Sequence, residues 1–135
     1  MNDIQWHPGT LLETSGSYWK TCTLHTGVNL DVFTVIGKKS LSVDDICKKT
    51  DTDPRGMSVL LNALSAMELI IKTGSLYSNS SPALTFLSKD SQKYIGFMIM
   101  HHHYLMESWS KMDGISSWPS SKIKKVSAAF QIKFL

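Results

Sequence analysis

Three consecutive histidines, His101, His102 and His103, are the residues best suited to chemistry in this chain. Imidazole nitrogens bind metals and exchange protons near neutral pH. Adjacent residues of a helix point about 100° apart, so three adjacent imidazoles cannot close on one metal ion. The run therefore predicts packed or surface histidines and no metal site. His103 is the one expected to face a pocket, because it lies four residues after Ile99.

No other catalytic or cofactor-binding pattern occurs in the 135 residues. The spacings G-x-G-x-x-G, G-x-x-x-x-G-K-[ST] and G-x-S-x-G are all absent, so no dinucleotide, phosphate or nucleophile-elbow site is predicted. Cys22 and Cys47 lack the spacing of a metal site, and we expect both to be reduced, buried thiols. We predict no catalytic, cofactor-binding or metal-binding residue in this chain.

The net charge of +3 comes from the last part of the chain. Residues 1–121 hold ten basic against eleven acidic side chains, a net of −1, and the remaining basic residues are Lys122, Lys124, Lys125 and Lys133. No apolar run approaches the roughly 20 residues of a membrane span, so no membrane partner is predicted. The first residues lack a basic stretch followed by an apolar one, which predicts a cytoplasmic protein.

The elements that would position these residues are organised around residues 41–79. Ser42 is a good N-cap for a short helix, and Asp53-Pro54 is a good start for a second one. The second helix has a predicted apolar face of Val59, Leu60, Ala63, Leu64 and Met67. Residues 69–71 and 76–77 are β-prone and flank Gly74, which predicts a hairpin. The predicted fold is mainly α, a winged helix-turn-helix with a small β-hairpin wing.

Helical segments are expected on both sides of this core. Residues 1–16 are predicted to form an N-terminal arm, in which His7-Pro8-Gly9 would interrupt any helix. One continuous helix is expected from Ser17 to Ile36. After the wing come a short helix at 83–87 and a long one from about Tyr94 to Asp113, ended by Gly114. The predicted dimerisation domain is 17–114, and 115–135 read as a linker or atypical basic tail.

Two features predict close packing between helices. Gly27 lies inside a helix at a cost of about 1 kcal/mol against Ala, so either another helix passes close by or the glycine is simply tolerated. The long helix is apolar on nearly every face, and one small core cannot cover all of them. Another chain or a further domain must do so. We therefore expect a homodimer through the first and last long helices.

A winged helix often binds DNA, but the face of the second predicted helix that would contact the bases carries few suitable side chains. That face would present Arg55, Ser58, Asn62 and Ser65, with Lys72 at the wing. Phosphate contact and base readout depend on several Lys and Arg side chains. Direct DNA recognition is therefore disfavoured. A stand-alone winged-helix DNA-binding transcriptional regulator stays as the alternative function.

Four segments in order resemble the N-terminal domain of S-adenosylmethionine-dependent O-methyltransferases, such as the acetylserotonin, caffeic acid and hydroxyneurosporene enzymes. These segments are Leu24–Phe33, Leu41–Ile46, Asp53–Gly56 with Leu60–Leu64, and Tyr104–Trp109 with Met112. The resemblance covers residues 17–113. It implies a domain that forms a homodimer and caps the substrate site of a catalytic domain.

The resemblance also implies substrate-lining positions near Tyr18, Trp19, Ile99, Met100, His103 and Leu105, although all of these could equally belong to a dimer core. The family's substrates are small hydroxylated molecules, and its cofactor, S-adenosylmethionine, binds a Rossmann-like catalytic domain. Nothing in these residues matches that domain. The resemblance therefore implies a chain that is inactive alone and a catalytic domain that is separate or missing.

Overall fold

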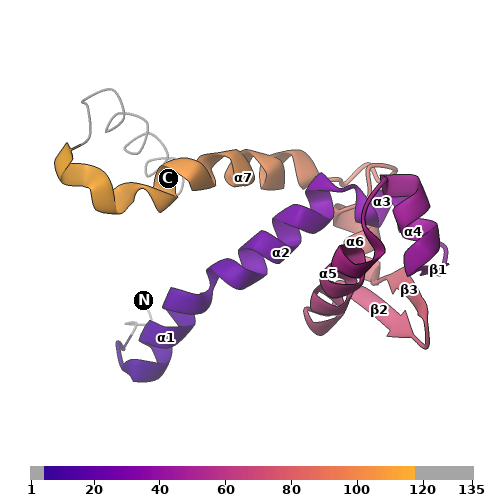
Figure 1. Cartoon of the computed structure of the whole chain (residues 1–135), viewed down its shortest axis with the longest axis horizontal. Coiled ribbons are helices and arrows are strands. Elements are labelled where there is room, and N and C mark those ends of the chain that lie inside the picture. The colour runs from indigo at the N-terminus through magenta and orange to yellow at the C-terminus, as the bar shows by residue number, and fades with distance from the viewer. Residues whose placement is uncertain (1–4, 118–135) are drawn as a thin grey trace. The chain divides into compact units, whose positions relative to one another are not determined.

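The structure is a computed structural model and describes residues 5–117. The chain divides after Gly96 into two compact units, and each is described by itself. Figure 1 labels the α-helices and strands of both. The first unit contains the helices α1 (Pro8–Gly16), α2 (Tyr18–Asn29), α3 (Val32–Ile36), α4 (Val43–Thr50), α5 (Pro54–Ala66) and α6 (Ser81–Phe86), and the strands β1 (Leu41–Ser42), β2 (Ile70–Thr73) and β3 (Leu76–Asn79).

The helix-turn-helix is α4 and α5, and both predicted N-caps are confirmed. Ser42 Oγ accepts a hydrogen bond from the Asp45 backbone N at 3.2 Å. Asp53 Oδ1 accepts one from the Gly56 backbone N at 2.9 Å, and Pro54 occupies the first turn. Each cap satisfies a backbone donor that the helix itself leaves unpaired, which fixes where the helix begins.

The predicted hairpin is confirmed as β2 and β3, which pair antiparallel with Thr73 opposite Leu76. Gly74 in the turn has φ +61°, a conformation that costs glycine little. β1 adds a third strand next to β3, with Leu41 opposite Tyr77. This strand was not predicted, because two residues directly before a helix give no alternating pattern of their own.

The core of the first unit lies between α2, α3, α4, α5 and the sheet. Its α5 side chains are Met57, Leu61 and Leu64, which follow the i, i+4, i+7 spacing of one helix face. The prediction that Val59 belongs to this face is wrong, because the Val59 side chain is 67% exposed. Two residues advance a helix by about 200°, so a helix that buries Met57 turns Val59 outward.

The predicted continuous helix from Ser17 to Ile36 is also wrong, because the chain breaks between α2 and α3. Asp31 adopts a left-handed conformation with φ +61°, which ends the α2 ladder and starts α3 in a new direction. Short polar residues such as Asp tolerate this conformation better than other L-residues. The new direction lets Val32, Phe33 and Ile36 enter the core, where all three are fully buried.

Gly27 is explained by close packing, which was one of the two alternatives. A Cβ built on Gly27 would lie 3.0 Å from Phe33 Cε2 and 3.1 Å from Leu64 Cδ1. Both neighbouring side chains are fully buried and so have little room to move. The glycine therefore allows α2 to approach α3 and α5.

Asn79, at the end of the wing, binds the end of α3. Its Nδ2 donates to the Phe33 carbonyl O at 2.8 Å and to the Gly37 carbonyl O at 2.9 Å. The last carbonyl groups of a helix have no partner within it. The Phe33 carbonyl also accepts from the Gly37 backbone N at 3.0 Å, whereas the Gly37 carbonyl lies just past the helix end and accepts from Asn79, 42 residues further along the chain. The two Asn79 bonds tie the wing to the helical core.

The predicted breaker at His7-Pro8-Gly9 is in fact the start of α1. Pro8 occupies the first helical position, where a missing N–H costs nothing, and His7 is the N-cap. α1 has no buried residue. In Figure 1, α1 and the first half of α2 extend beyond the rest of the first unit.

The second unit begins within α7 (Gly96–Ser110), which is shorter at both ends than predicted. Tyr94 lies outside this helix, and its ring occupies the space that a Cβ on Gly96 would need. A 3-10 helix, η1 (Met112–Ser117), follows and includes Gly114, which was predicted to stop the helix. Gly114 itself has non-helical backbone angles, φ −80° and ψ 15°, and marks a kink within η1. The predicted basic-tail lysines lie outside the described residues.

Candidate dimerisation surface

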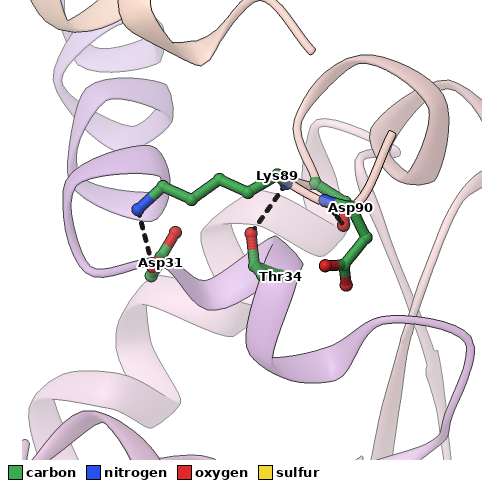
Figure 2. A network of polar contacts seen from close by, with 5 residues as sticks. Asp31, Thr34, Lys89 and Asp90 are labelled. Carbon is green, nitrogen blue, oxygen red and sulfur yellow. Dashed lines mark hydrogen bonds and ion pairs between the residues drawn. The ribbon is translucent and has the colours of Figure 1, made fainter. Parts of the chain in front are cut away.

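A polar cluster holds the segment that leads from α6 toward α7 (Figure 2). Lys89 Nζ lies 2.8 Å from Asp31 Oδ2, and the Lys89 backbone N donates to Thr34 Oγ1 at 3.0 Å. The hydrogen bond to the Asp31 carboxylate raises the pKa of Lys89, and partial burial opposes this shift. Residue 89 is thereby attached to the junction of α2 and α3 through its side chain and to α3 itself through its backbone.

Tyr18 and Trp19 lie in the first turn of α2, and both side chains are more than half exposed. Their rings meet edge to face, with centroids 5.6 Å apart. A third aromatic ring, that of Trp6, is exposed before α1, and α1 adds two exposed leucines. We call this set the arm surface: Trp6, Leu11, Leu12, Tyr18 and Trp19.

The other four predicted site residues lie on α7, in the second unit, and are partly exposed. Ile99, Met100 and His103 fall within about 100° of one another around the helix, so they share one side of it. Leu105 lies roughly 140° from Met100 by the same period, on a different side. The His103 ring meets the Tyr104 ring edge to face at 5.7 Å.

α7 also carries large apolar side chains that are exposed. We call these the α7 surface: Phe97, Met98 and Tyr104. The only buried residue of α7 that the structure describes is Gly96. That another protein surface covers this helix stays a prediction.

Two of the predicted DNA-contacting residues, Asn62 and Lys72, are bonded to each other. Lys72 Nζ donates to Asn62 Oδ1 at 2.9 Å, and the Tyr77 hydroxyl donates to the same oxygen at 3.0 Å. The Lys72 ammonium also lies 5.4 Å from the centre of the Tyr77 ring. These contacts fix the wing against α5. The Lys72 ammonium and the Asn62 amide oxygen are thus bonded within the protein, whereas base readout would require both groups.

Other candidate chemistry is sparse among residues 5–117. Within that range, no group of three or more metal-binding side chains comes together. None of the described helices is long and apolar enough to cross a membrane. A cavity of about 370 Å³ is lined by Gly37, Lys38, Leu84, Thr85, Ser88, Asp90 and Ser91, none of which is a predicted site residue.

The two cysteines lie in different surroundings. Cys47 is buried in α4, as predicted, whereas Cys22 is exposed on α2, so the prediction for Cys22 is wrong. Only the C-terminal half of α2 contributes buried residues, namely His25, Gly27 and Val28. Cys22 precedes that half and lies on the exposed part of the helix.

Comparison with known proteins agrees with this architecture. The family model of the O-methyltransferase dimerisation domain matches residues 12–89. The tetracenomycin polyketide synthesis 8-O-methyl transferase TcmO of Streptomyces glaucescens is 31% identical over 90 residues, which is 66% of this chain and 26% of TcmO. The chain thus spans about a quarter of the length of that relative.

Two solved structures share the fold. An O-methyltransferase family protein from Burkholderia thailandensis has a TM-score of 0.74 at 21% identity, over 83% of this chain and 33% of that one. Human N-acetylserotonin methyltransferase, solved in complex with SAM, has a TM-score of 0.71 at 16% identity, over 84% of this chain and 35% of that one. The family model covers more than half of the residues in the sequence. This chain therefore belongs to the O-methyltransferase dimerisation domain family.

Proposed function

We propose that this chain forms a homodimer through the arm surface and the α7 surface. The observation that supports the proposal is the exposure of large apolar side chains on α1, α2 and α7, outside a well-packed winged-helix core. Full burial of one such side chain is worth about 1.5–3 kcal/mol. A second copy of the chain offers the same apolar surfaces in return, as a symmetric dimer requires.

We further propose that the domain caps the acceptor site of an O-methyltransferase that acts on a small hydroxylated molecule. Tyr18, Trp19, Ile99, Met100, His103 and Leu105 are the proposed lining residues. Aromatic rings and apolar side chains with one imidazole suit a flat, partly polar acceptor. S-adenosylmethionine binding and methyl transfer belong, in this proposal, to residues outside this sequence.

The proposed domain division is an arm over 1–16, a dimerisation domain over 17–114 and a linker or basic tail over 115–135. α1 supports the first boundary, since it forms a helix of its own without buried residues. Limited proteolysis with mass analysis should cut first near these two boundaries.

The dimer is tested by light scattering on a sizing column at micromolar concentration. We expect about twice the chain mass of 15.1 kDa. Trp19→Glu and Phe97→Glu should each shift the mass toward the monomer, because they place an unpaired charge in a desolvated contact. Both side chains are about two-thirds exposed, at 65% and 66%, so the substitutions should leave the fold intact.

Val59→Glu is the matched control. Val59 is 67% exposed and lies on α5, outside both proposed surfaces. This variant should remain a dimer. A folded wild-type monomer would overturn the proposal, and so would equal loss of the dimer in all three variants.

A further inference from the structure

α1 begins with a histidine side chain as its cap. The Gly9 backbone N donates to His7 Nδ1 at 3.2 Å, and the His7 backbone N donates to Thr10 Oγ1 at 3.0 Å. The two bonds form a reciprocal capping box at the start of the helix. Nδ1 can accept the first bond only while it carries no proton.

The imidazole is fitted closely to the first turn. A Cβ built on Gly9 would lie 2.9 Å from His7 Cε1 and 3.1 Å from His7 Nδ1. A larger residue at position 9 would therefore displace the ring. The ring position therefore depends on Gly9. A histidine that only preceded a helix, without packing on its first turn, would not have this dependence.

α1 depends on this cap more than a packed helix would. It has nine residues, none of them buried, and no acidic residue in its first turn. Isolated helices shorter than about 12 residues are marginal in water. A side-chain cap typically changes the helix–coil equilibrium of such a segment by about fivefold.

The bonds of His7 among residues 5–117 are to uncharged groups. No ion pair or hydrogen bond of the described residues joins His7 to a carboxylate or an ammonium. The neighbouring polar groups are the Gln5 carbonyl O and the Thr10 hydroxyl, which are neutral and bonded to each other at 3.2 Å. Glu13, the titratable residue of α1 itself, lies six positions along the chain.

We propose that His7 makes α1 a proton-sensitive helix, closed by the neutral imidazole and opened when the imidazole is protonated. A proton on Nδ1 removes the acceptor for the Gly9 N–H and places two donors face to face. It also adds a positive charge at the positive end of the helix dipole. Leu11 and Leu12 lie on α1, so the opening would disorder part of the arm surface.

The test is a ¹³Cα chemical-shift titration of the full 135-residue chain between about pH 8 and pH 5, the range in which histidines change charge. The helical shifts of residues 8–12 should fall as the His7 ring resonances titrate. His7→Asn keeps a capping acceptor that takes up no proton. This variant should hold the same shifts constant over the same range.

His7→Ala provides the uncapped reference. Its α1 shifts should be low at both ends of the titration and should match the wild-type chain at pH 5. The proposal is overturned if wild-type α1 stays constant while the His7 ring titrates. It is equally overturned if His7→Asn loses its helical shifts in parallel with wild type, because another group would then be responsible.

Discussion

Lys89 Nζ lies 2.8 Å from Asp31 Oδ2, and these two residues are 58 positions apart in the chain. Asp31 is the left-handed residue that separates α2 from α3, and Lys89 belongs to the segment that follows α6. The ion pair therefore joins the bend that creates the core to the segment that precedes α7 (Figure 2).

The contribution of this pair should disappear at alkaline pH. The pKa of Lys89 is raised above 10.5 in the folded chain, chiefly by its hydrogen bond to Asp31. A raised folded-state pKa adds stability below the unfolded pKa, and this stability is lost as the pH rises through the folded value. Both side chains are more than a third exposed, so the contribution should stay within about 0.2–1 kcal/mol.

Lys89→Met should lower the free energy of unfolding by that amount near pH 7.5, measured by urea denaturation. The difference from wild type should shrink above pH 10.5, the ordinary value of a lysine. Asp31→Asn, which keeps a residue tolerant of positive φ, should behave in the same way. An equal difference at both pH values would assign the effect of Lys89→Met to packing instead of charge.

Gly27→Ala should destabilise the first unit although alanine is the better helix former. The helix-propensity gain is about 1 kcal/mol, whereas forcing an extra methyl into a packed core costs about 1–3 kcal/mol. Phe33 and Leu64, which the new methyl would touch, are fully buried. Thermal unfolding should therefore show a lower Tm.

Gly56→Ala is the control for this substitution. Gly56 is exposed in α5, and the nearest atom to a built Cβ is Asp53 Oδ1 at 3.8 Å, an ordinary contact. Here the propensity gain should act alone and raise stability by up to about 1 kcal/mol. If both glycine variants were stabilised, the packing explanation of Gly27 would fail.

Asn62→Ala should loosen the wing. It removes the acceptor shared by Lys72 and Tyr77, and the Tyr77 side chain is buried at 2% exposure. Leaving a buried hydroxyl without its partner costs about 1–3 kcal/mol. Asn62→Asp retains the oxygen and should cost less. Amide exchange in β2 and β3 should be faster in the alanine variant, and unchanged exchange there would contradict the assigned role.

The same contacts bear on DNA. We expect no preference for any duplex in a fluorescence titration of the full chain, because base readout would have to break the bond between Asn62 and Lys72. Any binding in low salt should disappear at higher salt, as phosphate contacts do. Selective, salt-resistant binding to one sequence would instead support a regulator.

Calorimetric titration of the chain with S-adenosylmethionine should give no heat above dilution. The reason lies in the sequence, which has no glycine-rich loop between a strand and a helix and no acidic ribose partner after it. Saturable binding at micromolar concentration would place a cofactor site within these 135 residues and refute the proposed division of roles.

The sequence by itself determined the features that depend on neighbours within three or four residues. The Ser42 and Asp53 caps, the Pro54 start and the Gly74 turn each join groups that are close along the chain. Such signals are local, because a cap or a turn is complete within one short segment.

Only the tertiary structure decided the features that depend on distant partners. Asp31 breaks a segment that reads as continuous helix, because the break lets Val32 and Phe33 reach the core. The sequence could not distinguish close packing at Gly27 from simple tolerance of a glycine, because Phe33 and Leu64, which pack against it, belong to other helices. Asn79 and Lys89 gave no signal at all, since each bonds to groups more than 40 residues away. A residue pattern records the period of one element, whereas the orientation of that element depends on the surfaces it meets.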